Sequence, residues 1–330
     1  MTISPTKMTD TSNSKAAMMD AVNTFIRKYG SYVTLLIIFI VSSLISPNFL
    51  TVTNIFLVLR QTAVLGIVAI GQTFVILTGG TDLSVSSLVS LSVVLITNLF
   101  GYNDSMAVPL LLLVLAVGII TGLTNGFFIS RLKIPSIVMT LGMQTLVLGA
   151  GLMYSKGVPN NRLTENFRFI GLGKIGEVPM PVIIWGVLIL IAVILLYNTN
   201  FGRRIYAVGG NAEAASFSGI NVKNTIMLAY IISAVCAVLA GYVLAARIGV
   251  GDNWVGVSMS LDSIAAVVIG GTAFTGGKGG VLTTIAGVLI MSFLYNLLLL
   301  MGVNYYWQEV VKGLVIILGV ILYTTRTQHE

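Results

Sequence analysis

The segment "PMPVIIWGVLILIAVILLY" (residues 179–197) carries no charged side chain. A transmembrane helix needs roughly 20 consecutive, mainly apolar residues, so this stretch is long enough to cross a bilayer. Runs of the same kind fill most of the sequence after Ser31. Hydrophobic residues make up 56% of the 330-residue chain and charged residues only 9%, whereas soluble domains carry about 25% charged residues. The sequence therefore predicts an all-α polytopic membrane protein.

Apolar runs predict ten membrane spans. Their approximate bounds are 31–48, 61–79, 85–101, 106–130, 135–155, 179–197, 225–247, 260–275, 281–301 and 307–324. Together they predict one transmembrane domain over 31–324, with an N-terminal tail over 1–30 and a C-terminal tail over 325–330. Residues 1–24 are polar and lack the apolar core of a signal peptide, so we expect a mobile tail there.

Basic residues predict the orientation of these spans, because Lys and Arg in short loops favour the cytoplasmic side. With both termini and loop 198–224 inside, eleven Lys and Arg residues lie inside and six outside. The six are Arg60, Lys156, Arg162, Arg168, Lys174 and Arg247, four of which share loop 156–178. We therefore place loop 156–178 outside. The net charge of +7 is read as topology rather than as nucleic-acid binding.

Two glycine-rich breaks interrupt the apolar pattern. The first is "GGTDLSVSS" (79–87) and the second is "GGTAFTGGKGG" (270–280), which opens with the same Gly-Gly-Thr. If the two correspond, the chain consists of two halves of five spans, and an odd number makes the second half inverted. Gly-interrupted segments at matching places in two halves are typical of transport pathways. We therefore expect broken or re-entrant segments near 79–87 and 260–280.

Loop 198–224 is too polar to be a span, and it contains "AVGGNAEAASFSGI" (207–220). Asn211 is a good N-cap, Glu213 suits the positive helix start, and Gly219 can end the helix in a left-handed turn. The result is a helix of about two turns, which is not stable alone in water. It is either a connector lying on its own domain or a helix that docks on a partner. The candidate docking residues are Gly210, Asn211, Glu213, Ala214, Ala215, Phe217, Ser218 and Gly219, with Phe217 as the anchor.

Five segments together resemble the permease subunits of bacterial ribose-type ABC sugar importers, within the branched-chain amino acid/ribose permease superfamily. They are "FVILTGGTDLSVSSLVSLS" (74–92), "GLTNGFFISRLKIPSIVMTLG" (122–142), "FGRRIYAVGGNAEAASFSGINV" (201–222), "LDSIAAVVIGGTAFTGGKGGVLTTIAGVLI" (261–290) and "LLMGVNYYWQEVVKGLVIIL" (299–318). The resemblance covers nearly everything from residue 31 onward. This sequence departs from the usual family form at Thr81, Ser86 and Leu297, where Ile, Gly and Gly are common.

The resemblance implies a subunit that forms the translocation pathway for a monosaccharide or related small polyol. It implies a bacterial inner-membrane protein whose partners are a second permease copy, identical or paralogous, a separate ATPase and a periplasmic sugar-binding protein. ATP and Mg would be bound by the ATPase, and this chain would bind no cofactor of its own. The helix matching residues 211–219 would contact the ATPase. Loop 156–178 would face the periplasm.

Polar residues inside or beside the spans are candidates for the pathway or for structural turns. They are Thr81, Asp82, Ser84, Asn125, Gln144, Asp262, Thr272, Asn296 and Gln308. Intramembrane acids usually face a cavity or a partner, so Asp82 could line the pathway. The sequence favours a helix N-cap at a turn on the membrane surface instead, and Asp262 can be interpreted in the same way. Glu309 and Lys312, three residues apart, predict a local ion pair.

Three other functions fit the sequence less well. The segment "TAFTGGKGG" is no P-loop, because Thr272 stands where the first Gly belongs and Gly279 follows Lys278. A single cysteine, Cys236, and a single histidine, His329, cannot build a metal cluster or the active site of a membrane enzyme. An ion-coupled secondary transporter is the main alternative, with Asp82 and Asp262 as its only candidate coupling acids. The identity of the sugar does not follow from the sequence.

Overall fold

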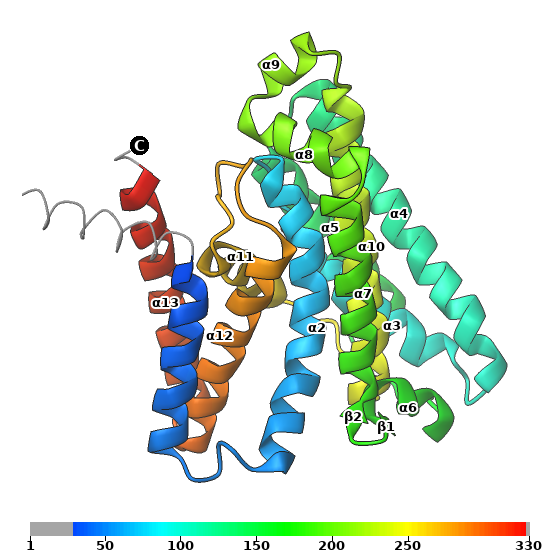
Figure 1. Ribbon diagram of the computed structural model, residues 1–330. Helices are drawn as coiled ribbons and strands as arrows, with labels where there is room; N and C mark the ends of the chain where they lie inside the picture. Colours follow the sequence, from blue (N-terminus) through cyan, green and yellow to red (C-terminus); the bar gives the residue numbers. More distant parts are fainter. Residues whose placement is uncertain (1–28, 328–330) are drawn as a thin grey trace, which may run out of the picture.

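A computed structural model describes residues 29–327 of the chain, so most of the two predicted tails and His329 lie outside the described residues. The described chain is a bundle of helices (Figure 1). After a first helix, Tyr29–Ile45, come α2 (Val52–Leu77), α3 (Val85–Leu99), the 3-10 helix η1 (Asp104–Met106), α4 (Ala107–Leu132), α5 (Ser136–Ser155), α6 (Glu165–Leu172), β1 (Lys174–Ile175), β2 (Val178–Pro179), α7 (Met180–Tyr197), α8 (Asn200–Gly210), α9 (Ala212–Phe217), α10 (Val222–Ile248), α11 (Met259–Gly270), α12 (Val281–Leu300) and α13 (Tyr305–Thr327).

Six of these helices are long and apolar enough to cross a membrane, namely α2, the continuous η1–α4, α5, α7, α10 and α12. The prediction of an all-α polytopic membrane protein is confirmed. Each of the ten predicted spans overlaps a helix, but the first helix, α3 and α11 are shorter than a full span. The count of ten therefore stays a prediction. Helix α2 begins at Val52, nine residues before the predicted bound. The polar Asn54 and Arg60 interrupt the apolar run there, so apolarity alone did not indicate its first turns.

The core lies along α10 and α2, the two long helices with the most buried windows (Figure 1). On α4, Gly118, Gly122 and Gly126 recur every four residues and face α10. A Cβ atom at Gly122 would lie 2.6 Å from the Cα of Ile231, so any larger residue there would push α4 and α10 apart. Small residues at this spacing let two membrane helices approach closely and gain dispersion contacts without any hydrophobic driving force between them.

The two polar loops lie at opposite ends of the bundle. Helices α8 and α9 project from one end, where α13 also ends, and α6 with the β1–β2 hairpin lies at the other (Figure 1). The hairpin is antiparallel and pairs Lys174 with Pro179 and Ile175 with Val178. This relative placement agrees with the predicted topology of loops 198–224 and 156–178. The side of the membrane that each end faces stays a prediction.

The proposed match between segments 79–87 and 270–280 stays a prediction. The two segments lie side by side in the fold. These two are in contact, because the Gly277 N–H donates to the Leu77 carbonyl at 3.0 Å and Gly276 lies against the backbone of Gly79. The two segments that share Gly-Gly-Thr therefore pack against each other at the end of α2.

A different segment, 249–258, has the same local geometry as the first break. Gly79 after α2 and Gly249 after α10 both have φ near the left-handed value, at 79° and 78°. Three residues later, Asp82 and Asp252 each accept the backbone N–H of the residue two positions on, at 3.0 and 2.9 Å. Each break then leads into a short apolar helix, α3 of 15 residues and α11 of 12.

Candidate functional site: the α8–α9 insert and the buried polar clusters

Helix α8 begins the insert between α7 and α10, and the sequence did not predict it. Thr199 caps its start by accepting the Gly202 N–H at 3.3 Å. Its apolar face buries Ile205 and Val208 against the bundle, while Arg203 and Arg204 remain exposed. The alternation of basic and apolar residues in "FGRRIYAV" is the signal that could have revealed an amphipathic helix here.

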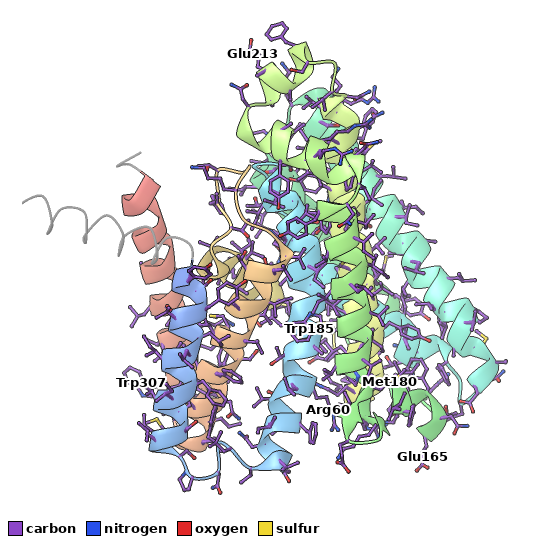
Figure 2. The ribbon with its side chains drawn as sticks, in the orientation of Figure 1. Arg60, Glu165, Met180, Trp185, Glu213 and Trp307 are labelled. Carbon is purple, nitrogen blue, oxygen red and sulfur yellow. The ribbon has the colours of Figure 1, made fainter. Side chains whose placement is uncertain are left out.

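Helix α9 follows at once and forms the tip of the molecule. Asn211 is its N-cap, as predicted, and accepts the Ala214 N–H at 2.9 Å. Gly219 ends it with φ +79°, also as predicted. The helix is shorter than expected, at six residues. Figure 2 shows Glu213 at the outermost part of this tip.

The candidate docking residues of α9 are nearly all open to solvent. Ala215 is 5% exposed and packs inward, whereas Phe217 is 86% exposed. The other six candidates, Gly210, Asn211, Glu213, Ala214, Ser218 and Gly219, are exposed as well. A fully exposed aromatic side chain at the tip of a polar insert makes no contribution to the fold of this chain. Such a side chain is typical of an anchor residue at an interface.

The base of the insert is joined to the bundle by glycines. A Cβ atom at Gly209 would lie 1.8 Å from the Leu77 carbonyl oxygen at the end of α2 and 2.5 Å from the Gly277 nitrogen. The Gly277 N–H donates to that same carbonyl. The end of α8, the end of α2 and loop 271–280 therefore meet backbone to backbone. We call this contact of Leu77, Gly209 and Gly277 the glycine junction.

Tyr206 adds a second link between the insert and loop 271–280. Its hydroxyl donates to the Gly279 carbonyl at 2.7 Å. Burial raises the pKa of this hydroxyl above its ordinary value, and the neighbouring Tyr197 adds to the shift, so the donor keeps its proton. The glycine junction and Tyr206 thus make a rigid connection from α8 to two separate parts of the bundle.

Asp82 lies in a buried polar cluster on the first break. It is fully buried, and its carboxylate accepts hydrogen bonds from the Ser84 N–H at 3.0 Å, the Ser84 hydroxyl at 2.6 Å and the Ser233 hydroxyl at 2.9 Å. The Asn125 amide donates to the Ser84 hydroxyl at 3.0 Å. The expected N-cap on the membrane surface is therefore corrected in two ways. The N-cap of α3 is Ser84, and Asp82 acts from two residues earlier inside the protein.

The backbone of the same break is held from α10 again and from two further helices, α5 and α2. The Thr81 carbonyl accepts from the Tyr230 hydroxyl of α10 at 3.2 Å, and its N–H donates to the Ser136 hydroxyl of α5 at 3.3 Å. The Gln72 amide of α2, in the orientation that satisfies both groups, bridges the Asp82 N–H and C=O at 3.2 and 3.1 Å. The sequence indicated Thr81, Asp82, Ser84 and Asn125. Gln72 was not predicted, although a single amide in an apolar run is a sign of a buried polar contact.

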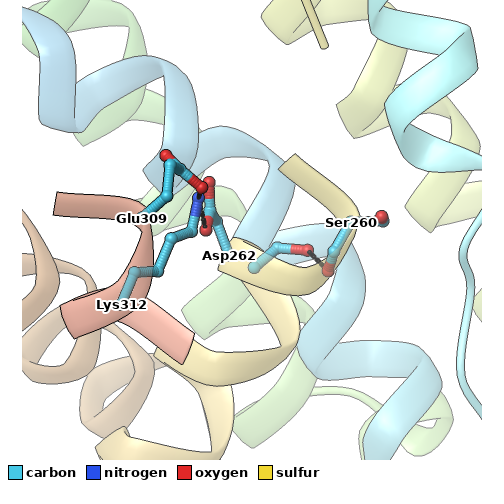
Figure 3. Close-up of polar contacts among 5 residues, drawn as sticks. Ser260, Asp262, Glu309 and Lys312 are labelled. Atoms are coloured by element: carbon cyan, nitrogen blue, oxygen red, sulfur yellow. Dashed lines mark hydrogen bonds and ion pairs between the residues drawn. The ribbon is translucent and has the colours of Figure 1, made fainter. Parts of the chain in front are cut away.

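Asp262 is no helix cap, which corrects the second expectation for an acid. It lies in the first turn of α11, and its carboxylate is 2.5 Å from the Lys312 ammonium of α13. The predicted pair between Glu309 and Lys312 is also present, at the longer distance of 3.6 Å. Figure 3 shows both acids converging on Lys312. The sequence found the local pair and missed the long-range one because spacing along a helix cannot report contacts between helices.

The remaining candidates do not join either cluster. The Thr272 hydroxyl is buried and accepts the Gly280 N–H at 3.1 Å, which closes loop 271–280. Asn296 exchanges two amide hydrogen bonds with Asn54, at 2.8 and 2.9 Å. The Gln308 amide donates to the Val303 carbonyl at 2.8 Å. Gln144 is half-buried on α5 and has no hydrogen bond within residues 29–327.

A pocket of about 220 Å³, with both polar and apolar side chains in its wall, lies between α2, α12 and α13. Its lining residues are Val58, Gln61, Leu65, Ser292, Tyr295, Asn296, Leu299 and Gln308. The Tyr295 hydroxyl is buried and makes no hydrogen bond of normal geometry within the described chain. Gln61 is exposed nine residues into α2, about 14 Å along the helix axis. Polar side chains at such depth face a partner or an aqueous cavity rather than lipid tails.

Comparison with known proteins now gives the family. The family described as branched-chain amino acid transport system / permease component matches residues 54–320. The chain belongs to this family. The ribose import permease protein of Escherichia coli is 40% identical over 296 residues, covering 88% of this chain and 92% of the relative. The protein of the same description from Bacillus subtilis is 40% identical over 300 residues, covering 90% and 92%.

A third permease relative carries another sugar in its description. The galactose/methyl galactoside import permease protein of Escherichia coli is 35% identical over 317 residues, covering 91% of this chain and 94% of the relative. No solved structure matches the chain. The predicted resemblance to ribose-type permeases is confirmed. Permease components of transport systems are not enzymes, and the membership favours this class over the ion-coupled alternative.

Both candidate coupling acids of that alternative make internal contacts in this permease. Asp82 is enclosed by hydrogen-bond donors, and Asp262 is paired with Lys312. An acid that couples transport to an ion gradient must exchange its proton or ion with water during each cycle. Neither acid is arranged for that exchange, which agrees with the family assignment.

Proposed function

We propose that this chain is the transmembrane permease subunit of an ABC importer in a bacterial inner membrane. It forms the translocation pathway for a monosaccharide or related small polyol. A periplasmic binding protein delivers the sugar, and a separate ATPase that binds ATP and Mg drives its passage. A second permease copy completes the pathway. The names of the ribose and galactose relatives support the class of substrate.

The observation that carries this proposal is the α8–α9 insert. Its tip offers an exposed Phe217 on a low-profile helix, and its base contacts α2 and loop 271–280 through the glycine junction. A partner that moves α9 would therefore move two parts of the bundle together. We infer that α9 is the contact with the ATPase and that both termini lie with it in the cytoplasm.

Two variants of α9 test the proposal at once. Phe217→Ala removes the anchor and should weaken ATPase binding by about 2 kcal/mol or more, close to thirtyfold. Glu213→Lys places a positive charge at a positive helix end and weakens α9 itself. Phe169→Ala, an exposed aromatic on α6 at the opposite end, is the matched control. The measurement is co-purification of the ATPase and sugar uptake at equal membrane abundance.

Each result of this experiment decides between the two interpretations of the insert. Loss of ATPase binding in both α9 variants and retention in Phe169→Ala supports coupling through α9. Normal ATPase binding and uptake in both α9 variants would show that the insert is only a connector. The interface would then have to be sought around Arg131 and Lys133.

We further propose that the chain consists of two inverted halves, the first helix to α5 and α7 to α13. Support comes from the breaks at 79–84 and 249–254, which share a left-handed glycine and an aspartate turn. In this arrangement α2 corresponds to α10 and α3 to α11. An experimental structure whose halves fail to superpose after rotation about an axis in the membrane plane would contradict it.

We propose that the pocket between α2, α12 and α13 lines the pathway, with Asn296 and Gln308 in its wall. Thr81, Asp82, Ser84, Asn125 and Thr272 then serve structural turns. Gln61→Cys and Ser292→Cys should react with a hydrophilic thiol reagent, whereas Leu190→Cys, an exposed apolar position at similar depth on α7, should not. Equal reactivity at all three positions would contradict a polar pathway here.

A further inference from the structure

A second pocket, of about 350 Å³, lies beside the first turns of α2. Five residues of α2 and Lys174 of β1 line it, and they are Val52, Thr53, Phe56, Leu57, Arg60 and Lys174. The Lys174 ammonium lies 5.3 Å from the centre of the Phe56 ring. One wall of the pocket is therefore apolar, and two cations line the rest. The cations match the charge of an anionic lipid headgroup, and the apolar wall matches the first carbons of its acyl chains.

The two cations have no counter-ion within the described chain. No carboxylate among residues 29–327 pairs with Arg60 or Lys174. The Nε atom of Arg60 is buried and has no hydrogen-bond partner there. Arg247 lies near enough to Arg60 for the two positive charges to act on each other. Arg60 is half-buried whereas Lys174 is exposed, so the cost of an unpaired charge falls on Arg60 and its neighbour Arg247.

The position of the pocket shows which kind of anion can reach it. Arg60 is eight residues from the start of α2, about 12 Å along the axis. Figure 2 shows it on α2, near the end of the bundle that carries α6. Val52 and Leu57 beside it are exposed apolar residues. A soluble protein approaching that end would meet the loops first. A lipid reaches the side of a membrane helix directly.

We propose that Arg60 and Lys174 bind the phosphodiester of an anionic membrane lipid. The Arg60 guanidinium can contact two phosphate oxygens in parallel, and Lys174 supplies a point charge. The first acyl carbons lie along Val52, Phe56 and Leu57. A phosphodiester at this place would supply the negative charge that the two cations lack. The proposal does not depend on which sugar the permease carries.

Arg168 contacts Arg247 at the end of α10 and is not part of the proposed lipid site, which consists of Arg60 and Lys174. Its guanidinium donates to the Arg247 carbonyl at 3.5 Å and lies against Gly249. It therefore serves the carboxyl end of α10, where carbonyl groups lack partners and a positive charge is favourable. Substituting Arg168 would disturb that helix end, so it is left unchanged in the test.

The test uses the full-length permease, purified in detergent and examined by native mass spectrometry. Phosphatidylglycerol, phosphatidylcholine and inorganic phosphate are the probes, each at the same concentrations. The variant Arg60→Gln/Lys174→Gln removes both cations. The control Lys156→Gln/Arg162→Gln removes two exposed cations from the same loop region. The charge-preserving pair Arg60→Lys/Lys174→Arg separates loss of charge from loss of fold.

We expect the wild type, the control and the charge-preserving pair to bind phosphatidylglycerol at least tenfold more tightly than phosphatidylcholine. The Arg60→Gln/Lys174→Gln variant should lose this preference. Equal phosphatidylglycerol binding by that variant would overturn the proposal. It would also be overturned if inorganic phosphate displaced the lipid at matched concentration, since the site would then serve a soluble anion. Sugar uptake measured on the same variants is a separate readout of the proposed function.

Discussion

At the scale of single residues, Asp82 and Asp262 are two buried carboxylates with different partners. Asp82 is surrounded by neutral donors, the Ser84 N–H and the hydroxyls of Ser84 and Ser233. Asp262 is balanced by the charge of Lys312. A carboxylate held by neutral donors can be replaced by an amide of the same shape. A carboxylate held by a cation cannot, because the cation is left buried and alone.

For Asp82, we predict that asparagine is tolerated and alanine is not. The Asn oxygen can accept both bonds from Ser84, and the Ser233 hydroxyl can turn to accept from the amide. Alanine leaves buried donors unpaired at a cost of about 1–3 kcal/mol. Thermal unfolding in detergent and sugar uptake at equal abundance measure the difference. Loss of uptake in Asp82→Asn protein of normal stability would show that the charge itself takes part in transport.

For Asp262, we predict strong coupling with Lys312. Lys312→Met alone should cost about 3–5 kcal/mol, because it leaves a buried carboxylate uncompensated. The double variant Asp262→Leu/Lys312→Met should recover most of that loss, since a buried pair is often replaceable by apolar residues. Unfolding measured across the full cycle gives the coupling. Additive losses in the double variant would mean that Asp262 and Lys312 act independently.

At the scale of elements, the insert depends on two helices that the sequence signals unequally. Helix α9 has an N-cap, an acidic first turn and a glycine stop, all local features. Helix α8 is fixed by what its buried side touches, including Leu77 and loop 271–280. A contact between segments more than sixty residues apart leaves no local signature. The glycine junction could therefore not be predicted from the sequence, because it depends on the contact between Gly209 and Gly277 in the folded chain.

Gly209 and Gly210 are neighbours with opposite surroundings, which makes a matched test of the glycine junction. A Cβ atom at Gly209 would collide with the Leu77 carbonyl at 1.8 Å, whereas one at Gly210 meets nothing within 4 Å. We predict that Gly209→Ala forces α8 away from α2 and abolishes sugar uptake. Gly210→Ala should leave uptake close to wild type. Equal uptake by the two variants, at equal membrane abundance, would show that α8 transmits nothing to α2.

At the scale of the whole molecule, the two polar ends must lie on opposite sides of one membrane. The insert occupies one end, and loop 156–178 with α6 and the hairpin occupies the other (Figure 1). Of the basic residues predicted to lie outside, Arg247 interacts with both Arg60 and Arg168 at that second end. These three residues belong to helices and to contacts between helices. Counting Arg60, Arg168 and Arg247 as loop charges therefore overstates how many basic residues outside the membrane oppose the predicted orientation.

Cysteine labelling of the whole protein tests the orientation. In a Cys236→Ser background, we predict that Ser218→Cys on the insert reacts only with reagent that reaches the cytoplasm. Arg162→Cys in the opposite loop should react with an impermeant reagent added to whole cells. Both positions are exposed, so access and not burial decides the outcome. Labelling of Ser218→Cys from outside would invert the topology and remove the basis for ATPase contact.

The sequence by itself determined the features that depend on nearby residues or on composition. These are the membrane class, the approximate places of the helices, the capped helix after Asn211, and the motifs that resemble ribose-type permeases. The tertiary structure decided which distant groups meet. It set the contact of segment 79–87 with loop 271–280, the pair of Asp262 with Lys312, and the glycine junction. The physical reason is that caps, turns and apolar runs act over a few residues of chain, whereas burial of a charge or a backbone contact depends on helices that fold together from far apart.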